Sequence, residues 1–358
     1  MIYYVIPMLL CVGALLGRNS RGWKLFFWFC ALLMVAMAGL RWETGTDWIP
    51  YYEHFCDPSS RDDLEGGYNL MVECIRACTA NYTVFLCIDA ALSIVLVGLT
   101  CHLILGPSAQ AMIVFYCYYF LGAWFGAQRR QLAIALCFFS VYWIRKKKFI
   151  PFSICILIAA QFHVTSLTFL LAYPIYHMKR RHLAIASGIF LSFVLLVSSV
   201  GINNLLTILS NVGILEHITH RAIAYLFEGA AGESQSVISV FLGVGKRMAF
   251  VSVFYFVGSR NGDDDYARLL RIYTVSVVIY AASVSTVSIF SVISVYFSII
   301  EVLLIPMMLI RLNLKRTHEC LLLVLYCIFQ TNSMLSGMPD LYIPYYSVFD
   351  HTTRMVIY

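Results

Sequence analysis

Charged side chains are scarce in this sequence. Asp, Glu, Lys and Arg together make up 12% of its 358 residues, whereas hydrophobic residues make up 61%. A soluble core of this length could not bury so much apolar surface, which excludes a soluble globular protein. The composition therefore predicts an all-α, polytopic integral membrane protein, with residues 1–358 forming a single membrane domain.

The sequence also lacks the features of a cleavable signal peptide. Its first apolar run has neither a basic segment before it nor a small-residue cleavage site after it. A membrane-spanning helix needs about 20 apolar residues. On that basis we predict about 12 spans, at residues 2–17, 23–40, 83–105, 109–125, 127–144, 149–162, 164–178, 183–200, 236–257, 268–287, 289–310 and 319–335. Two of them are short and residues 272–306 contain no clear turn, so the count is open by one or two.

Basic residues orient the predicted helices. Four Lys/Arg clusters follow the first, fifth, seventh and eleventh helices. All four lie on one side if the N-terminus is outside, and the positive-inside rule makes that side the cytoplasm. The net charge of +6 is therefore a topology signal and implies no nucleic-acid partner. Residues 41–82, with eight acidic and three basic side chains, and residues 201–235 then form two long periplasmic loops.

The twelve cysteines show no disulfide framework. Most of them lie in apolar helices, where a thiol acts as a small hydrophobe. Cys56, Cys74 and Cys78 lie in the first outer loop. A disulfide from Cys56 to one of the other two stays open.

Residues 39–52 follow directly on the second predicted helix. Arg41 stands at the mouth of that helix, Gly45 permits a tight turn, and Asp47 follows within the same loop. A cation, a carboxylate and aromatic rings at a membrane surface fit a site for an anionic, lipid-linked substrate. The alternative is an interfacial belt of aromatic side chains at headgroup level, made by Trp42, Trp48, Tyr51 and Tyr52.

The remainder of the first outer loop predicts an amphipathic helix on the bilayer, because apolar residues recur at helical spacing from Tyr68 to Tyr82. The next predicted span carries Asp89 about two turns from its outer end. An intramembrane carboxylate is a functional candidate. A carboxylate that water still reaches is the equal alternative.

Arg129 and Arg130 lie in a very short outer loop, at a helix N-terminus whose dipole favours an anion. Arginine can bind phosphate through two parallel hydrogen bonds, so a phosphate and an acidic loop residue are both candidate partners. His163 lies at the same outer level, between two short helices. It is either a hydrogen-bonded structural residue or a general base near neutral pH.

The second half of the chain adds further candidates. His217, His220 and Arg221 share one helical face. No third metal ligand is placed beside the two histidines, so we expect no metal site. Arg247 and Glu301 fall near the midpoints of two predicted helices, where either an ion pair between the helices or a cavity lined by Arg247 is consistent with the pattern.

Five short motifs follow one another along the first half of the chain. They are Gly39-Leu40-Arg41, Gly45-Thr46-Asp47 with Tyr51, Glu65-x-Gly67-Tyr68, Arg130-Gln131-x-Ala133, and Phe162-His163-x-Thr165-Ser166. In order, spacing and membrane placement they resemble the EpsG family of Wzy-type polysaccharide polymerases. Later residues are also similar, namely Tyr296-Phe297, Glu301, Pro306 and Tyr342-Ile343-Pro344-Tyr345. Family members often carry a basic residue before that Tyr-Phe pair, which this chain lacks, so Arg221 or Arg247 would have to replace it.

The resemblance implies an enzyme of the bacterial cytoplasmic (inner) membrane with a periplasmic active face. The implied layout is that of the GT-C-like, membrane-embedded lipid-sugar transferases, without a metal or other cofactor. The implied substrate is an undecaprenyl-pyrophosphate-linked oligosaccharide. The growing glycan would move from its lipid pyrophosphate to the non-reducing-end hydroxyl of the next lipid-linked repeat unit. The lipid bilayer is a second partner, and a chain-length regulator is a further candidate.

Glycosyl transfer needs a deprotonated acceptor hydroxyl and a stabilised leaving pyrophosphate. We predict His163 as the base, with Asp47 as its rival or as the residue that orients an arginine. The candidates for the pyrophosphate are the arginines, namely Arg41, Arg129, Arg130, Arg221 and Arg247. The candidates for glycan contact are Trp42, Glu65 and Tyr68.

Three other functions stay open. An O-antigen ligase would use similar cations on the same face but would hand the glycan to a lipid A core. A flippase or transporter of the lipid-linked unit would have about this many helices. It would be expected to show polar residues along a central path, shorter outer loops and no base. A structural or assembly partner is the third and least favoured alternative, since it gives no reason for the paired outer arginines.

Overall fold

The computed structural model describes residues 2–16, 21–58, 64–200, 237–258, 264–283 and 288–350. Over these residues every assigned element is a helix, apart from one isolated bridge between Arg41 and Ser347. The predicted all-α class is therefore confirmed for the described part of the chain. The predicted loop 201–235, and Arg221 within it, lie outside the described residues.

The chain folds into two compact units, a division that the sequence analysis does not predict. The first unit comprises Met1–Leu170 and Glu301–Tyr358, and the second comprises Leu171–Ile300. The helices assigned within or beginning in the first unit are η1 (Ile2–Tyr4), α1 (Val5–Leu16), α2 (Arg21–Gly39), α3 (Trp48–Cys56), α4 (Gly66–Cys78), α5 (Tyr82–Leu105), α6 (Ala109–Val114), η3 (Phe115–Trp124), α7 (Gln128–Arg145), α8 (Phe149–Ala160), η4 (Val164–Leu171), α16 (Glu301–Leu312), α17 (Arg316–Gly337) and α18 (Pro339–Tyr342). Those of the second unit are α9 (Ala172–His177), α10 (Arg180–Val200), α13 (Val237–Gly258), α14 (Asp265–Ser283) and α15 (Ser288–Ser298).

Each predicted span overlaps a helix or a pair of consecutive helices. The interval 289–310, however, is two helices, α15 and α16, with a turn at Ile299 and Ile300. Glu301 therefore lies in the first turn of α16, and its predicted place near a helix midpoint is wrong. A carboxylate is favoured there because a helix N-terminus carries a partial positive charge.

Helix α3 has no counterpart among the predicted helices. It is only nine residues long and contains Pro50, so its sequence lacks the long apolar run that marks the other helices. Proline is tolerated there because it falls in the first turn, where a backbone N–H has no partner within the helix. The predicted helix from Tyr68 onward is observed as α4, which ends at Cys78 before Tyr82 and buries Tyr68, Val72 and Ile75 on one face. Its place on the bilayer stays a prediction.

Several helices are apolar enough for a membrane protein. Among the described residues, Gly22–Gly39, Tyr82–Leu105 and Arg316–Gly337 are each long and apolar enough to cross a bilayer. The number rises to four if Phe290–Ser298 and Glu301–Leu312 count as one broken span. The observed helices thus support a membrane protein, while about 12 crossings and their orientation stay predictions.

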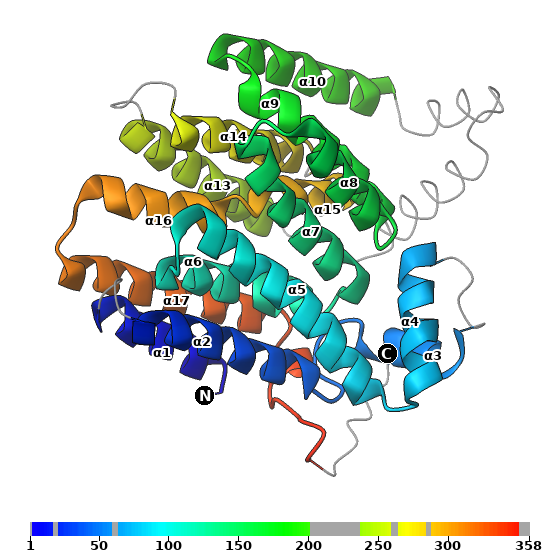
Figure 1. The fold of residues 1–358 in the computed structure, drawn as a ribbon. Helices are drawn as coiled ribbons and strands as arrows, with labels where there is room; N and C mark the ends of the chain where they lie inside the picture. The colour runs from blue at the N-terminus through cyan, green and yellow to red at the C-terminus, as the bar shows by residue number, and fades with distance from the viewer. Residues whose placement is uncertain are drawn as a thin grey trace. The chain divides into compact units, whose positions relative to one another are not determined.

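In the first unit, α2 packs along α5, and α5 packs along α7 (Figure 1). The end of α2 approaches α5 closely because Gly39 has no side chain. A Cβ atom at Gly39 would lie 2.6 Å from the Cys87 sulfur and 2.8 Å from its Cα atom. This contact holds the end of α2, and with it Arg41, against the beginning of α5.

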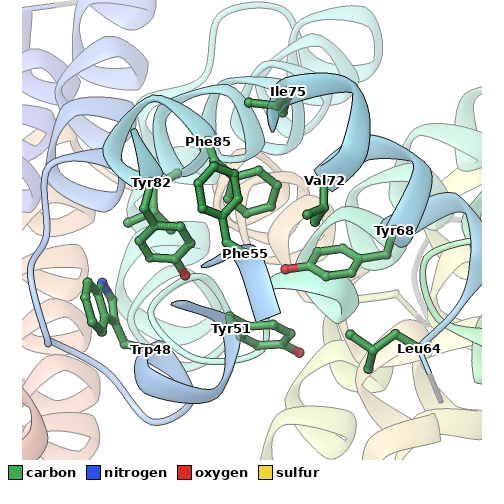
Figure 2. Packing of buried hydrophobic residues seen from close by; sticks show 10 residues of the cluster. Trp48, Tyr51, Phe55, Leu64, Tyr68, Val72, Ile75, Tyr82 and Phe85 are labelled. Atoms are coloured by element: carbon green, nitrogen blue, oxygen red, sulfur yellow. The ribbon is translucent and has the colours of Figure 1, made fainter. Parts of the chain in front are cut away.

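Side chains from α3, α4 and α5 point toward one another and form an aromatic core (Figure 2). The core is made by Trp48, Tyr51, Phe55, Leu64, Tyr68, Val72, Ile75, Tyr82, Phe85 and Leu86. Trp48 and Tyr51 are buried in the protein, so these two rings do not form the exposed interfacial belt that was the alternative reading of this loop. Cys56, Cys74 and Cys78 are exposed free thiols. The described parts of the first loop thus pack on α5 as a helical layer.

Candidate functional site

The segment after α2 is pinned by the C-terminal part of the chain. The Trp42 N–H donates to the Tyr346 carbonyl at 2.9 Å, and the Gly45 N–H donates to the Leu341 carbonyl at 3.0 Å. Gly45 has φ +107°, and a Cβ atom there would lie 1.6 Å from the Phe125 carbonyl oxygen. The predicted turn at Gly45 is confirmed, and only glycine satisfies both its conformation and its close approach.

Arg41 is 1% exposed, and one side of its guanidinium is anchored. Its Nη1 donates to the Ala38 carbonyl at 2.7 Å, and its Cζ lies 5.4 Å from the centre of the Phe125 ring. Over the described part of the chain, Nε and Nη2 are buried without a hydrogen-bond partner. Nε and Nη2 form the edge of a guanidinium that binds two oxygen atoms at once. Arg41 therefore keeps an anion-binding edge unused.

Arg41 lies near a buried acidic residue, Asp89. Burial lowers the pKa of Arg41, while the nearby Tyr82 and Asp89 act in the opposite direction. Asp89 is itself 1% exposed and accepts a hydrogen bond from the Gln131 amide through Oδ2. Its Oδ1 and the Gln131 Oε1 are buried and find no partner among the described residues. An arginine stays protonated at neutral pH despite such burial.

Arg129 lies in the first turn of α7 and is already paired. Its Nη1 forms a salt bridge with Glu65 Oε2, and its Nε donates to the Tyr51 hydroxyl at 3.2 Å. The sequence analysis predicts a phosphate or an acidic loop residue as the partner of Arg129, and the structure shows an acidic loop residue, Glu65. Its neighbour Arg130 has a buried Nε that makes no hydrogen bond within the described ranges.

Glu65 joins α4 to two other parts of the site. While Oε2 faces Arg129, Oε1 accepts a hydrogen bond from the Val164 N–H at 3.2 Å. Two residues later, a Cβ atom on Gly67 would lie 2.5 Å from Gln161 Cβ and 2.8 Å from the Gln161 carbonyl oxygen. The Glu-x-Gly-Tyr motif thus docks α4 onto the turn that contains His163.

The predicted glycan contacts lie partly in the core. Tyr68 is 1% exposed, and its hydroxyl donates to the Gln128 amide oxygen at 3.1 Å. Gln128 in turn donates to the Tyr82 hydroxyl at 2.6 Å. Trp42 packs against Trp48 with ring centres 4.8 Å apart. This geometry gives Tyr68 a packing role, and contact of Trp42 or Glu65 with a sugar stays a prediction.

His163 lies in the turn between α8 and η4, as predicted, and is 9% exposed. Its Nδ1 is 2.6 Å from the Thr165 hydroxyl oxygen. Burial lowers the pKa of His163 to about 4, with Glu65 raising it and Arg129 and Arg130 lowering it further. The imidazole is therefore neutral at neutral pH, which is the form that accepts a proton.

The comparison with known families agrees with this grouping of motifs. The EpsG family model matches residues 24–347. The chain belongs to the EpsG family. Membership makes it a polysaccharide polymerase-type membrane protein. Searches of curated proteins and of solved structures return no match.

In this EpsG protein the motif residues gather at two places in the first unit. Arg41 lies with Asp89 and Gln131, whereas Arg129 and Arg130 act on His163 together with Glu65. The amide side chains of Gln128 and Gln131 make hydrogen bonds to Tyr68, Tyr82 and Asp89, and the sequence analysis predicts no role for either residue. Their signal is the position beside the paired arginines, in the first two turns of α7.

The remaining candidate residues in the described part of the chain are Asp47 and Arg247. Asp47 directly precedes α3 and makes no side-chain capping hydrogen bond. Arg247, in the second unit, donates to the Gly243 carbonyl at 3.1 Å and lies 3.4 Å from the centre of the Tyr280 ring. Its contact with substrate and its ion pair with Glu301 stay predictions. Within the described ranges, no group of three His, Cys, Asp or Glu side chains is placed to hold a metal ion.

Proposed function

We propose that this EpsG protein is a polysaccharide polymerase of the bacterial inner membrane. It transfers the growing glycan from undecaprenyl pyrophosphate to the non-reducing-end hydroxyl of the next lipid-linked repeat unit, at the periplasmic face. Family membership supports the polymerase class and the membrane location. The observation that carries the proposal is the pair Arg129 and Arg130 at a helix N-terminus beside a buried, neutral His163.

The cations act on the departing pyrophosphate. As the bond between the sugar and the phosphate oxygen breaks, negative charge develops on that oxygen and is stabilised by preorganised donors. The Arg130 guanidinium and the first-turn N–H groups of α7 supply such donors. The unused edge of Arg41 is a second donor of the same kind. In this proposal guanidinium groups provide the stabilisation and no metal is required.

His163 acts as the base in this proposal. The imidazole takes the proton of the acceptor hydroxyl while the new glycosidic bond forms and the pyrophosphate leaves. A pKa of about 4 is low for this task, since the best base has a pKa near the working pH. A bound pyrophosphate would raise it, because a nearby negative charge favours the imidazolium. Asp47 stays the rival base.

The polymer ladder of a deletion strain tests this function. The strain is complemented with wild type, Arg130→Ala or His163→Ala, and with Arg76→Ala as control, because Arg76 is an exposed arginine of α4. Membrane levels of each variant are measured by blot. We expect single capped repeats from both site variants and a full ladder from the control.

The same gel separates the alternative functions. A full-length ladder from both site variants at normal protein level would refute the two assignments. Absence of any repeat on the lipid A core would instead indicate a ligase. Repeat units trapped on the cytoplasmic side would indicate a flippase.

A further inference from the structure

We propose that Glu65 is a positioning residue, which presets both Arg129 and the His163 turn before substrate binds. This inference rests on the proposed function. It replaces the sequence-based expectation that Glu65 contacts the glycan. The observation behind it is that one carboxylate uses its two oxygens on two different elements, Oε2 on α7 and Oε1 on the residue after His163.

The geometry leaves Glu65 little capacity for a sugar. Its side chain is 12% exposed, and that of Arg129 is 14% exposed. Arg129 is fixed from a second side by the Tyr51 hydroxyl, 3.2 Å from Nε. The carboxylate, the guanidinium and the phenol therefore form one enclosed network, in which each group limits the rotation of the others.

The second oxygen acts on the turn. The Val164 N–H belongs to the first residue of η4 and has no partner within that helix, as is usual for a helix N-terminus. Glu65 Oε1 accepts from it at 3.2 Å, and so caps η4 from outside its own segment. Gly67 and the Tyr68 N–H, which donates to the Gln161 carbonyl at 3.2 Å, hold the preceding part of the same turn. His163 lies between these two attachments.

Preset side chains need no rearrangement when the reaction begins. A misplacement of about 1 Å at a reacting group can cost about 100-fold in rate. Glu65 also places a negative charge near the imidazole, opposite in effect to the charges of Arg129 and Arg130. Loss of Glu65 therefore changes both the position and the acid–base behaviour of His163.

Two Glu65 variants separate the charge from the backbone contact. Glu65→Gln keeps the length and an oxygen for the Val164 N–H but loses the charge that pairs with Arg129. Glu65→Ala loses both contacts. Glu73→Gln and Glu73→Ala are the matched controls, because Glu73 is an exposed acid on α4, the helix that begins directly after Glu65. All are compared as full-length protein in lipid nanodiscs.

The first measurement is hydrogen exchange of the peptide that covers residues 161–166, which requires no activity. We expect faster exchange in Glu65→Ala and wild-type exchange in both Glu73 variants. The second is the pH–rate profile of polymerisation with a synthetic lipid-linked repeat unit. We expect kcat of Glu65→Gln to fall by about 100-fold with KM nearly unchanged.

The pH profile carries the signature that a merely structural role would not give. Among the described residues, the charged groups that act on the pKa of His163 are Glu65, Arg129 and Arg130. The acid limb should move to lower pH in Glu65→Gln and to higher pH in Arg129→Gln. Unchanged exchange in Glu65→Ala, or acid limbs that move together, would overturn the proposal. Normal polymerisation by His163→Ala would instead overturn the base assignment, and the catalytic part of this proposal with it, even where exchange changes as expected.

Discussion

Two adjacent glycines at the beginning of α4 provide a matched test of how α4 orders the site. A Cβ atom on Gly67 would lie 2.5 Å from Gln161 Cβ and 2.8 Å from its carbonyl oxygen, whereas one on Gly66 would meet nothing within 4 Å. Ordinary contacts between such atoms are about 3.5–4.0 Å. Gly67→Ala therefore displaces α4 from the His163 turn by roughly 1 Å, while Gly66→Ala displaces nothing.

The displacement breaks contacts that are already near their limit. The Tyr68 N–H to Gln161 carbonyl distance and the Val164 N–H to Glu65 distance are both 3.2 Å. A hydrogen bond at about 4 Å is lost. Overpacking costs about 1–3 kcal/mol, offset by up to about 1 kcal/mol because alanine is the better helix former. We expect Gly67→Ala to lower stability by about 1–2 kcal/mol and polymerisation by about 100-fold.

Gly66→Ala should instead raise the stability of the protein, since alanine favours the helix and its Cβ atom meets no neighbour. The assay is the polymer ladder together with melting of the purified protein in nanodiscs, with both variants measured beside wild type. Equal behaviour of the two alanine variants in ladder and melting would refute the claim that the Gly67 contact with Gln161 holds α4 in place.

Two further predictions concern buried side chains of the same unit. Tyr68→Phe removes the hydroxyl that donates to Gln128 and leaves a buried acceptor unpaired. We therefore expect the free energy of unfolding, measured by melting, to fall by about 1–3 kcal/mol. A full loss of polymer at unchanged stability would point to glycan contact instead. Folding lowers the pKa of His163 from 6.5 to about 4, so as the pH falls the imidazole is protonated in the unfolded chain before it is protonated in the folded one. The free energy of unfolding should therefore fall by up to about 3 kcal/mol as the pH drops from 6.5 towards 4. His163→Gln should remove that part of the acid sensitivity in melting curves, and an unchanged dependence on pH would contradict a buried neutral imidazole.

The sequence predicts the long helices well because each needs an apolar run, and such runs are visible without any knowledge of packing. It fails at α3, whose nine residues are stabilised by rings from α4 and α5 rather than by its own pattern. It also fails at Glu301, because no glycine or proline marks the turn at Ile299 and Ile300. Local sequence carries little information on elements that tertiary contacts define.

In the candidate site, the sequence predicts several of the residues but not the partners that they contact. Arg41, Arg129, Arg130 and His163 are predicted from charge at an outer helix end, and the structure places the last three together. The pairing of Arg129 with Glu65 joins residues 64 positions apart, and no local spacing predicts which acid it meets. The backbone on either side of Arg41 is hydrogen-bonded to the C-terminal segment, which lies still farther away in sequence.

Arg129 and Arg130 are adjacent in the first turn of α7, but the structure gives them different surroundings. Consecutive residues of an α-helix point about 100° apart, so one acidic side chain does not easily hold both guanidinium groups. Glu65 and Tyr51 hold Arg129, and the Arg130 Nε is left without a partner in the described residues. An anion arriving at the helix N-terminus would thus meet one arginine whose charge is already balanced and one whose donor is unused. Under the proposed function, Arg129 therefore makes the structural salt bridge, and Arg130 is the arginine that we propose to bind the pyrophosphate.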